Sequence, residues 1–495
     1  MTLHDIYLLS PELSLAALGV VVILLDMVVR RKGILGAVSV VGLAVPLAFS
    51  ISLWGDLSGE PNGQMVGIFN TLVVDEFSLF FKFLVMGILA LVVMSSVEYV
   101  SRIRQFQGEY YGLMIFSASG MMLLAATTDL ISIYIALELT TLPLVALAAF
   151  MRDSRSTEAG VKFLLLSAMS SAVLLYGMAL TYGFTGTTQL SEIFERLGAS
   201  FDATVPFGSN ALFLGVIMIV AGFGFKIAAV PFQMWVPDVY EGAPTPITAY
   251  LSVASKAAGF AVILRVFYLA FGELSLDWGA LFAVLSAVSM TVGNLVAIAQ
   301  SNIKRMLAYS TIAHAGFLMV GVAAVAARVP AGETAIGPSG VLFYLVAYAA
   351  TNLAAFFAII AISSRTGSDM ISSFAGMGRR APFLAIVLAF SMVSLLGIPP
   401  TAGFIGKLYM FSAAMKSDLA WLVVVGVVNS AVSAYYYLRV IRVMYTAQPE
   451  TEEPVPVAYA PRVALCITGL GILVLGIFPD PLITAAEKAV AILFL

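Results

Sequence analysis

The stretch that decides the fold is GFGFKIAAVPFQMWVPDVYEGAPTP, residues 222–246. Its first part is apolar enough to lie in a membrane, yet it carries Lys226, and Pro231 follows five residues later. Because proline has no backbone N–H and its ring clashes with the preceding turn, a helix through this stretch must kink or break. Within a bilayer such a break is tolerated only against protein or a hydrated cavity. The stretch therefore predicts a broken membrane helix with a lysine beside the break.

The composition of the whole chain is that of a membrane protein. Of its 495 residues, 61% are hydrophobic and only 11% are charged, whereas soluble domains have about 25% charged residues. Apolar segments close to the ~20 residues that cross a bilayer lie at 9–29, 34–54, 73–98, 110–128, 130–150, 158–184, 211–240, 243–271, 276–301, 303–328, 338–364, 382–415, 420–446 and 461–479. The sequence thus predicts an all-α polytopic membrane protein with about 14 transmembrane helices.

The loop charges predict the orientation of these helices. Threading alternate loops to opposite sides puts fifteen basic residues on one side: Arg30, Arg31, Lys32, Arg102, Arg104, Arg152, Arg155, Lys304, Arg305, Arg365, Arg379, Arg380, Arg439, Arg442 and Arg462. The other side receives four: Arg196, Arg328, Lys416 and Lys488. Since basic loops stay in the cytoplasm, we expect both termini on the periplasmic side.

Few side chains in the sequence are suited to hold a redox centre or a metal. Cys466 is the only cysteine, and His4 and His314 are the only histidines. An iron–sulfur cluster needs about four thiolates. We therefore expect no cofactor and no metal in this chain, and the absence of a basic patch predicts no nucleic-acid binding.

Six basic residues fall inside the apolar segments. Lys82 and Arg265 lie near segment ends, where we expect them to extend their charges to the membrane surface. The other four have no such explanation, and a lysine at the centre of a membrane helix costs roughly 2.5–3.5 kcal/mol. Burial disfavours the charged form of an amine, and a nearby carboxylate favours it. A lysine whose carboxylate partner can approach or withdraw therefore binds a proton with two affinities. The candidate proton sites are Lys162, Lys226, Lys256 and Lys407.

The expected carboxylate is Glu138, in IALELTTLPLV, which we interpret as the only acidic residue deep within the apolar segments. Lys162 has two interpretations, because Glu158 one turn earlier could form an ordinary surface pair with it. His314, which follows hydroxyl side chains at 309–311, also has two: a proton relay, or a buried imidazole that is simply hydrogen-bonded.

A second helix break is predicted at Pro399 and Pro400, in LLGIPPTAGFIGKLYM, with Lys407 close by. The two breaks fall in predicted helices 7 and 12, five apart, as they would if helices 4–8 and 9–13 were inverted copies of one unit. Inverted repeats with broken helices are typical of transporters. The predicted domains are three helices at 1–109, the first repeat at 110–271, the inverted repeat at 272–446, and a connector with the last helix at 447–495.

Several long motifs are familiar. They are FKIAAVPFQMWVPDVYEGAPTPITAYLSVASKAAGFAVILRV at 225–266, LELTTLPLVAL at 137–147, EAGVKFLLLSAMSSAVLLYGMAL at 158–180, NIKRMLAYSTIAHAGF at 302–317, GIPPTAGFIGKLYMF at 397–411 and SAYYYLRVIRVMY at 433–445. Together they resemble the antiporter-like membrane subunits of bacterial NADH:quinone oxidoreductase (respiratory complex I), over nearly the whole chain. Among these the chain looks like the subunit N family: LSVASKAAGF stands where subunits L and M typically have a histidine, and Lys407 where subunit M has glutamate.

The resemblance implies a proton-translocating subunit in the membrane arm of the complex, in the bacterial inner membrane. Electron transfer from NADH to quinone would drive it, with FMN, iron–sulfur clusters and quinone in other subunits. Its expected partners are the lipid bilayer and other membrane subunits, including neighbouring antiporter-like ones. By the same resemblance Glu138 and Lys226 form a charge pair, Lys256 is the central relay, Lys407 leads to the outer face, and the water chain is supported by Lys162 and His314.

Two other functions are compatible with a membrane protein of this kind. A multisubunit Na⁺/H⁺ antiporter shares the fold, but sodium needs several oxygen ligands, and lysines repel a bound cation. A purely structural membrane scaffold would have no use for four costly buried lysines. The sequence therefore favours proton translocation over both alternatives.

Overall fold

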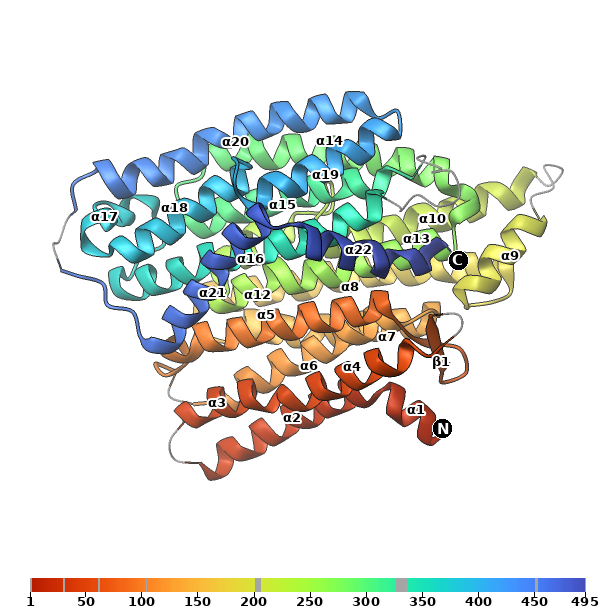
Figure 1. Ribbon diagram of the computed structural model, residues 1–495, viewed down its shortest axis with the longest axis horizontal. Coiled ribbons are helices and arrows are strands. Elements are labelled where there is room, and N and C mark those ends of the chain that lie inside the picture. The colour runs from red at the N-terminus through yellow and green to blue at the C-terminus, as the bar shows by residue number, and fades with distance from the viewer. Residues whose placement is uncertain are drawn as a thin grey trace.

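The computed structural model describes residues 2–29, 32–60, 63–103, 105–200, 206–325, 336–449 and 453–494. The described chain is mostly helical, and its long helices run side by side along the long axis of the molecule (Figure 1). Four residues used to predict the orientation lie outside the described residues: Arg30, Arg31, Arg104 and Arg328.

Within the described residues, 11 helices are long and apolar enough to cross a membrane. They are Ser10–Val28 (α2), Gly33–Leu57 (α3 and α4), Glu76–Val100 (α5), Leu130–Ala148 (α7), Ser154–Thr185 (α8), Thr245–Leu269 (α12, η1 and α13), Trp278–Ile298 (within α14), Ile303–Ala323 (α15), Ile336–Thr366 (α16), Ala420–Thr446 (α20) and Tyr459–Ile477 (α21). The all-α polytopic membrane class is thereby confirmed.

The three other predicted segments are helical as well. They contain α6 (Gln107–Ala126), the pair α10 (Pro206–Ile227) and α11 (Trp235–Gly242), and the pair α18 (Pro382–Leu396) and α19 (Ala402–Lys416). The two pairs are the predicted broken helices, each interrupted at its prolines. The total of fourteen membrane crossings stays a prediction.

Short elements connect the long helices. Strands β1 (Gln64–Gly67) and β2 (Leu72–Asp75) form an antiparallel hairpin. The other short elements are α1 (Leu3–Leu8), α9 (Leu190–Ser200), η2 (Gly272–Leu274), η3 (Ile371–Phe374), α17 (Met377–Arg380), α22 (Asp480–Ala491) and η4 (Ile492–Phe494). The predicted segment 73–98 therefore begins in β2, and α5 starts only at Glu76. Asp75 caps α5, since its Oδ1 accepts from the Ser78 amide at 2.7 Å.

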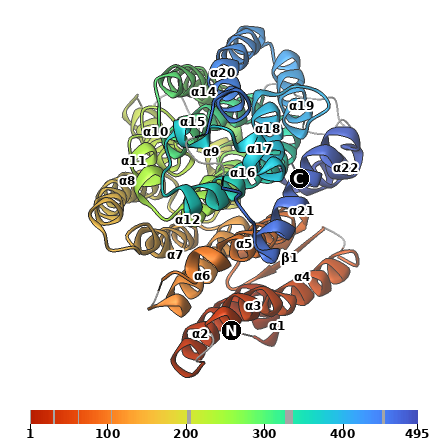
Figure 2. The ribbon, with the colours of Figure 1, turned by 90° about the vertical axis from the view of Figure 1, so that its left-hand side faces the viewer.

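The centre of the molecule is formed by three spans. Thr245–Leu269, Ile303–Ala323 and Ile336–Thr366 have 100%, 94% and 83% of their apolar windows buried, against 28% for Ser10–Val28. Figure 2 shows α2, α3 and α4 as an outlying layer and α16 near the middle. Polar groups on the central spans therefore face protein rather than lipid.

The packing inside the two predicted repeats is similar. In residues 110–271, α6 packs on α7 and α8 on α10; in residues 272–446, α14 packs on α15 and α16 on both α18 and α19. The last helices also match, since α13 contacts α6 and α20 contacts α14. This pattern agrees with two copies of one unit, whose inverted relation stays a prediction.

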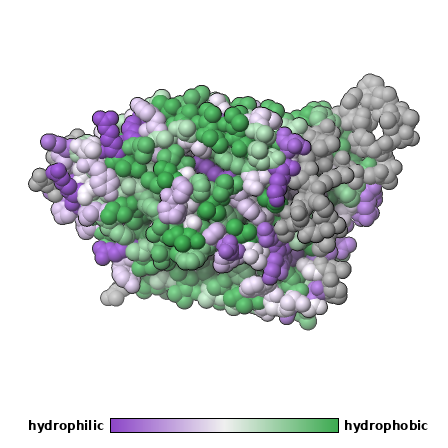
Figure 3. Space-filling view, turned by 45° about the horizontal axis from the view of Figure 1, so that its top comes forward, coloured by the Kyte–Doolittle hydropathy of each residue, from purple (hydrophilic) through white to green (hydrophobic). Residues whose placement is uncertain are grey.

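The surface differs along the long axis. Figure 3 shows mostly hydrophobic side chains across the middle of one face, with hydrophilic side chains at its left end and again toward the right. Hydrogen bonds join two of the predicted cytoplasmic arginines to the ends of distant spans: Arg102 Nη1 donates to Ser364 O at 2.7 Å, and Arg439 Nη1 to Ile298 O at 3.0 Å. Elements α1 and α22 both lie toward the opposite end (Figure 1).

Candidate functional site

The first helix break lies between Ile227, the last residue of α10, and Trp235, the first of α11. Polar groups released by the break find partners: the Val230 amide donates to Ser289 Oγ at 2.9 Å, and Trp235 Nε1 donates to Phe225 O at 3.0 Å. A helix break at membrane depth requires that the freed polar groups find hydrogen-bond partners in this way. Because Ser289 belongs to α14, the second predicted repeat supports the break in the first.

Lys226 and Glu138, the expected charge pair, are not in direct contact. Lys226 is 6% exposed and its Nζ donates to Thr141 Oγ1 at 2.7 Å. Glu138 Oε1 accepts from Ser171 Oγ at 2.5 Å. Thr141 lies three residues after Glu138 on α7, so the Lys226 amine is held about one helical turn from Glu138, whose carboxylate instead accepts from α8. The separation leaves the amine and the carboxylate each held by a hydroxyl, from which either could move to form the pair.

Lys256 is the most enclosed of the central amines, at 3% exposed. It follows a π-helical turn, Leu251–Ser255, a distortion that is frequent at functional sites. Its Nζ donates to Thr311 O on α15 and lies 5.4 Å from the centre of the Tyr348 ring on α16. Among the described residues no carboxylate pairs with it. A carbonyl and an aromatic face therefore replace the usual counter-charge.

His314 lies in a cage of tyrosine hydroxyls. Its Nδ1 is 2.6 Å from Tyr344 Oη and its Nε2 is 3.1 Å from Tyr437 Oη. Tyr437 Oη is also 2.5 Å from Ser310 Oγ, and nearby on α15 Thr311 Oγ1 is 2.8 Å from Tyr348 Oη. The imidazole is thus fully hydrogen-bonded. Its partners are groups that both donate and accept, which is the property a proton relay needs.

Lys407 lies at the second break, on α19. Its Nζ donates to Leu395 O and Leu396 O, both at 3.0 Å, and to Ser430 Oγ at 3.2 Å. These carbonyls end α18, and Gly397 follows with φ +90°, a conformation that side chains other than glycine rarely adopt. The amine therefore binds the negative end of a helix dipole where the Pro399–Pro400 break exposes it.

Lys162 is less buried than the other three lysines, with its side chain 41% exposed. Its Nζ pairs with Glu158 Oε1 at 2.8 Å, the i,i+4 pair expected from the sequence, and with Asp238 Oδ2 on α11 at 2.7 Å. The second contact was not predicted, and it places Lys162 beside the segment that follows the first break.

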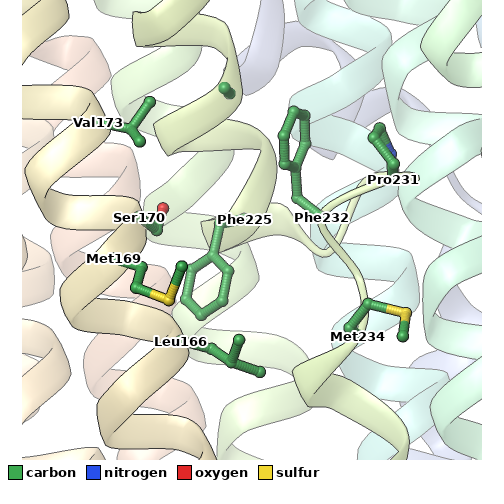
Figure 4. A pocket seen from close by; sticks show the side chains of 9 residues that line it. Leu166, Met169, Ser170, Val173, Phe225, Pro231, Phe232 and Met234 are labelled. Carbon is green, nitrogen blue, oxygen red and sulfur yellow. The ribbon is translucent and has the colours of Figure 1, made fainter.

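An apolar pocket of about 250 Å³ opens between α8 and the first break. Figure 4 shows Met169 and Phe225 on one side and Phe232, Pro231 and Met234 on the other. The rest of its lining is Leu166, Ser170, Val173 and Ala221. None of these side chains is ionisable at neutral pH, so the lining supplies no proton-binding group.

Two expectations about the other basic residues are wrong. Lys82 and Arg265 do not reach the membrane surface: their side chains are 0% and 1% exposed. Lys82 Nζ lies 2.9 Å from Glu12 Oε1, and Arg265 binds both oxygens of Asp75, at 2.7 and 2.9 Å.

Two acids were therefore overlooked when Glu138 was taken as the only deep carboxylate. Glu12 is 4% exposed and Asp75 is 0% exposed, although both lie near the ends of apolar segments. Hydropathy alone placed them at the surface, whereas the β hairpin and α1 cover that end of the helices. A sequence signal was available, since an acid near the end of an apolar segment can pair with a base at the same end of a neighbouring segment.

The arrangement of central groups crosses both repeats. It runs from Glu138 and Lys226 to Lys256. Lys226 packs against the helical turn that follows Lys256, because a Cβ added at Gly259 would lie 3.4 Å from Lys226 Cγ. It continues from Lys256 through α15 to His314, and ends at Lys407. Direct hydrogen bonds cover parts of this line, and bridging water would have to cover the rest.

No group of three or more potential metal-ligating His, Cys, Asp or Glu residues occurs in the described part of the chain.

Comparison with known proteins agrees with this geometry. Residues 126–433 match the family model described as NADH:quinone oxidoreductase/Mrp antiporter, transmembrane. The chain belongs to this family. NADH-quinone oxidoreductase subunit N of Dehalococcoides mccartyi is 44% identical over 489 residues, covering 97% of this chain and 98% of the relative. Subunit N of Moorella thermoacetica is 42% identical and covers 99% of each chain.

Solved structures give the same result for the fold of this family member. A chain of respiratory complex I from Thermus thermophilus superposes with a TM-score of 0.79 at 33% identity, covering 97% of this chain and 99% of that one. A chain of the Mrp complex from Dietzia sp. has a TM-score of 0.83 at 21% identity, covering 100% and 98%. At that identity the Mrp likeness shows the fold alone.

Proposed function

We propose that this chain is a proton-translocating subunit of the membrane arm of NADH:quinone oxidoreductase, working without a redox centre of its own. The observation that carries this proposal is the line of buried amines at the two helix breaks, in a chain 44% identical to a subunit N. The active groups would be Glu138, Lys226, Lys256, His314 and Lys407, with Lys162 at the cytoplasmic end.

The chemistry follows from how each amine is held. Hydroxyls and carbonyls bind Lys226, Lys256 and Lys407 in the described structure, and no carboxylate neutralises any of them directly. Without a fixed counter-charge, the charged form of a buried amine depends on small movements of its neighbours. Approach of the Glu138 carboxylate to Lys226 would favour proton binding there, and its return to Ser171 would favour release toward Lys256.

The surroundings of the subunit follow from the same proposal. It would lie in the bacterial inner membrane, in contact with lipid and with other membrane subunits, including neighbouring antiporter-like ones. Its Arg- and Lys-rich end would face the cytoplasm and both termini the periplasm. FMN, the iron–sulfur clusters and quinone would be bound by other subunits.

A multisubunit Na⁺/H⁺ antiporter remains the second candidate, because the Mrp chain shares the fold. Two observations favour the respiratory complex: identity is 33% to the complex I chain against 21% to the Mrp chain, and the central line consists of amines. A sodium ion prefers several oxygen ligands, and nearby ammonium groups repel it. The route is better suited to protons.

Substitution of the central lysines tests the proposal. In inverted membrane vesicles, Lys226→Ala and Lys256→Ala should each lower the proton gradient formed per NADH oxidised, with the complex still assembled. Unchanged pumping in both variants would refute the assigned roles. Sodium uptake without an electron donor, by the chain with its native partners, would support the antiporter instead.

A further inference from the structure

Asp238 holds two basic side chains from different helices at one end of the molecule. Its Oδ2 is 2.7 Å from Lys162 Nζ on α8, and its Oδ1 is 2.8 Å from Arg305 Nη1 on α15. Each base has one further acid: Glu158 for Lys162 at 2.8 Å, and Glu241 for Arg305 at 2.9 Å. Asp238 is thus the carboxylate that the two bases share. We call Lys162, Asp238 and Arg305 the α11 clamp.

The clamp fastens the segment that follows the first helix break. Helix α11 lies between α8 and α15 (Figure 2) and contacts both. Its far end is held as well, because Lys304 Nζ donates to Ala243 O at 2.9 Å. At its near end, Trp235 Nε1 reaches back to Phe225 O, next to Lys226. The position of α11 is therefore linked both to the clamp and to the backbone around Lys226.

The two helices joined by the clamp carry the partners of the central charges. On α8, Ser171 lies nine residues after Lys162, about 14 Å along the helix, and donates to Glu138. On α15, Thr311 lies six residues after Arg305, about 9 Å along, and its carbonyl accepts from Lys256. Asp238 thus connects α8, which hydrogen-bonds Glu138, to α15, which hydrogen-bonds Lys256.

The two bases of the clamp differ in what they can do. An arginine guanidinium is rigid and planar, whereas a lysine ammonium stands on a flexible four-carbon stem. Arg305 is therefore the steadier partner of Asp238, and Lys162 is the partner that can turn away into the cavity. Because Lys162 is 41% exposed, its ion pair is weak enough to break and reform during turnover.

The clamp also has access to water. A polar cavity of about 200 Å³ lies beside it, lined by Arg155, Glu158, Ala159, Lys162, Asp238, Glu241, Gly242 and Arg305. A site of this size and polarity can hold several water molecules. Three basic and three acidic side chains line it, so their formal charges balance and the cavity has no excess charge to hold an anion.

We propose that Asp238 is a positioning residue for proton uptake: it holds the Lys162 ammonium beside the hydrated cavity and links the position of that ammonium to α11. While Lys162 binds Asp238, the carboxylate ties α8 to α15 through α11. When the Lys162 ammonium turns into the cavity, Asp238 remains with Arg305 alone, and the tie between α8 and α11 is loosened. The hydrated cavity is thereby coupled to the broken helix that carries Lys226. The inference rests on the proposed function and adds a residue to it.

Replacement of the shared carboxylate is the direct test. Asp238→Asn should lower the gradient formed per NADH in inverted vesicles at least threefold, normalised to assembled complex, and Asp238→Glu should restore most of it. The matched controls are Glu158→Gln and Glu241→Gln, which each remove one pair but leave the clamp; they should stay within twofold of the unaltered chain. Asp238→Asn that pumps normally, or controls that lose as much as it does, would overturn the proposal.

A double variant asks whether the clamp acts as one unit. If Asp238 works through Lys162, Asp238→Asn combined with Lys162→Gln should pump as well as whichever single variant pumps less. Losses that multiply would mean independent roles and would overturn the coupling. Lys162→Gln also tests the clamp from its other side should Asp238→Asn fail to assemble.

The same vesicles separate this inference from the proposed function. Normal pumping in Lys226→Ala and Lys256→Ala would remove the proposed function itself. Loss of pumping in those two variants together with normal pumping in Asp238→Asn would remove the clamp alone.

Discussion

The buried pair of Arg265 and Asp75 allows a prediction with a magnitude. Arg265 donates to both Asp75 oxygens, at 2.7 and 2.9 Å, and its Nε donates to Ala125 O at 3.0 Å. The side chains are 1% and 0% exposed, so solvent does not screen the pair. Removing one partner of such a pair costs about 3–5 kcal/mol, because the other charge stays buried. Asp75→Asn should therefore lower the free energy of unfolding by about 3–5 kcal/mol.

Two further variants divide this cost into its parts. Asp75 Oδ1 also accepts from the Ser78 amide and caps α5, a role that Asn keeps and Ala loses. Asp75→Ala should consequently be about 1 kcal/mol less stable than Asp75→Asn. The double variant Asp75→Asn with Arg265→Met removes the stranded charge, and should recover all but the ~1–3 kcal/mol that an unpaired Ala125 carbonyl costs.

The measurement is the unfolding free energy of the chain in bicelles by steric trapping. The temperature at which half of the protein leaves its monodisperse peak in size-exclusion chromatography gives a second reading. The reasoning depends on the order of the three variants. If the double variant were no more stable than Asp75→Asn, the stranded guanidinium would not be the source of the cost, and the explanation would be wrong.

Three other predictions follow from the described contacts. Glu12→Gln should reduce assembly by stranding Lys82, and Lys82→Met added to it should restore assembly on native gels; an equal defect in both would contradict the pairing. Lys407→Arg should assemble but pump poorly, because a guanidinium keeps its proton; normal pumping would show that a fixed charge suffices at this position. The pKa of Asp5 is lowered from 3.8 to about 2, chiefly because its carboxylate accepts from the Ile68 amide; its contribution is present above pH 3.8 and is lost as pH falls towards 2, so the protection of that amide, relative to an unprotected amide at the same pH, should fall over this range, and constant protection would contradict the contact.

Much of the fold could be predicted because the helix breaks have a local cause. Pro231, Pro399 and Pro400 each lack the donor that a continuous helix needs, and the structure interrupts α10–α11 and α18–α19 at those positions. The apolar segments needed only length and composition. The hairpin β1–β2 was missed because β2 is itself apolar and joins directly to α5, so hydropathy could not separate strand from helix.

The candidate site could be predicted less completely, because its partners come from distant parts of the chain. The sequence identified Lys256 by its cost in a membrane and His314 by the hydroxyl side chains at 309–311. It could not identify Tyr348, Tyr344 and Tyr437, which lie between 30 and 127 residues from the side chains of α15 that they contact. Tyrosine in an apolar helix carries no such cost, so nothing in its local sequence marks it as a partner.

Five of the buried bases in the described residues fall into two classes that the sequence could not separate. Lys82 and Arg265 each have a carboxylate within 3 Å, so their charge is fixed: Lys82 joins α5 to α2, and Arg265 joins α13 to the start of α5. Lys226, Lys256 and Lys407 are instead held by hydroxyls or carbonyls. Neutral partners stabilise a charged amine less than a carboxylate does, so its proton is easier to remove. The presence or absence of a bound acid, rather than burial alone, therefore separates the structural bases from the groups proposed to move protons.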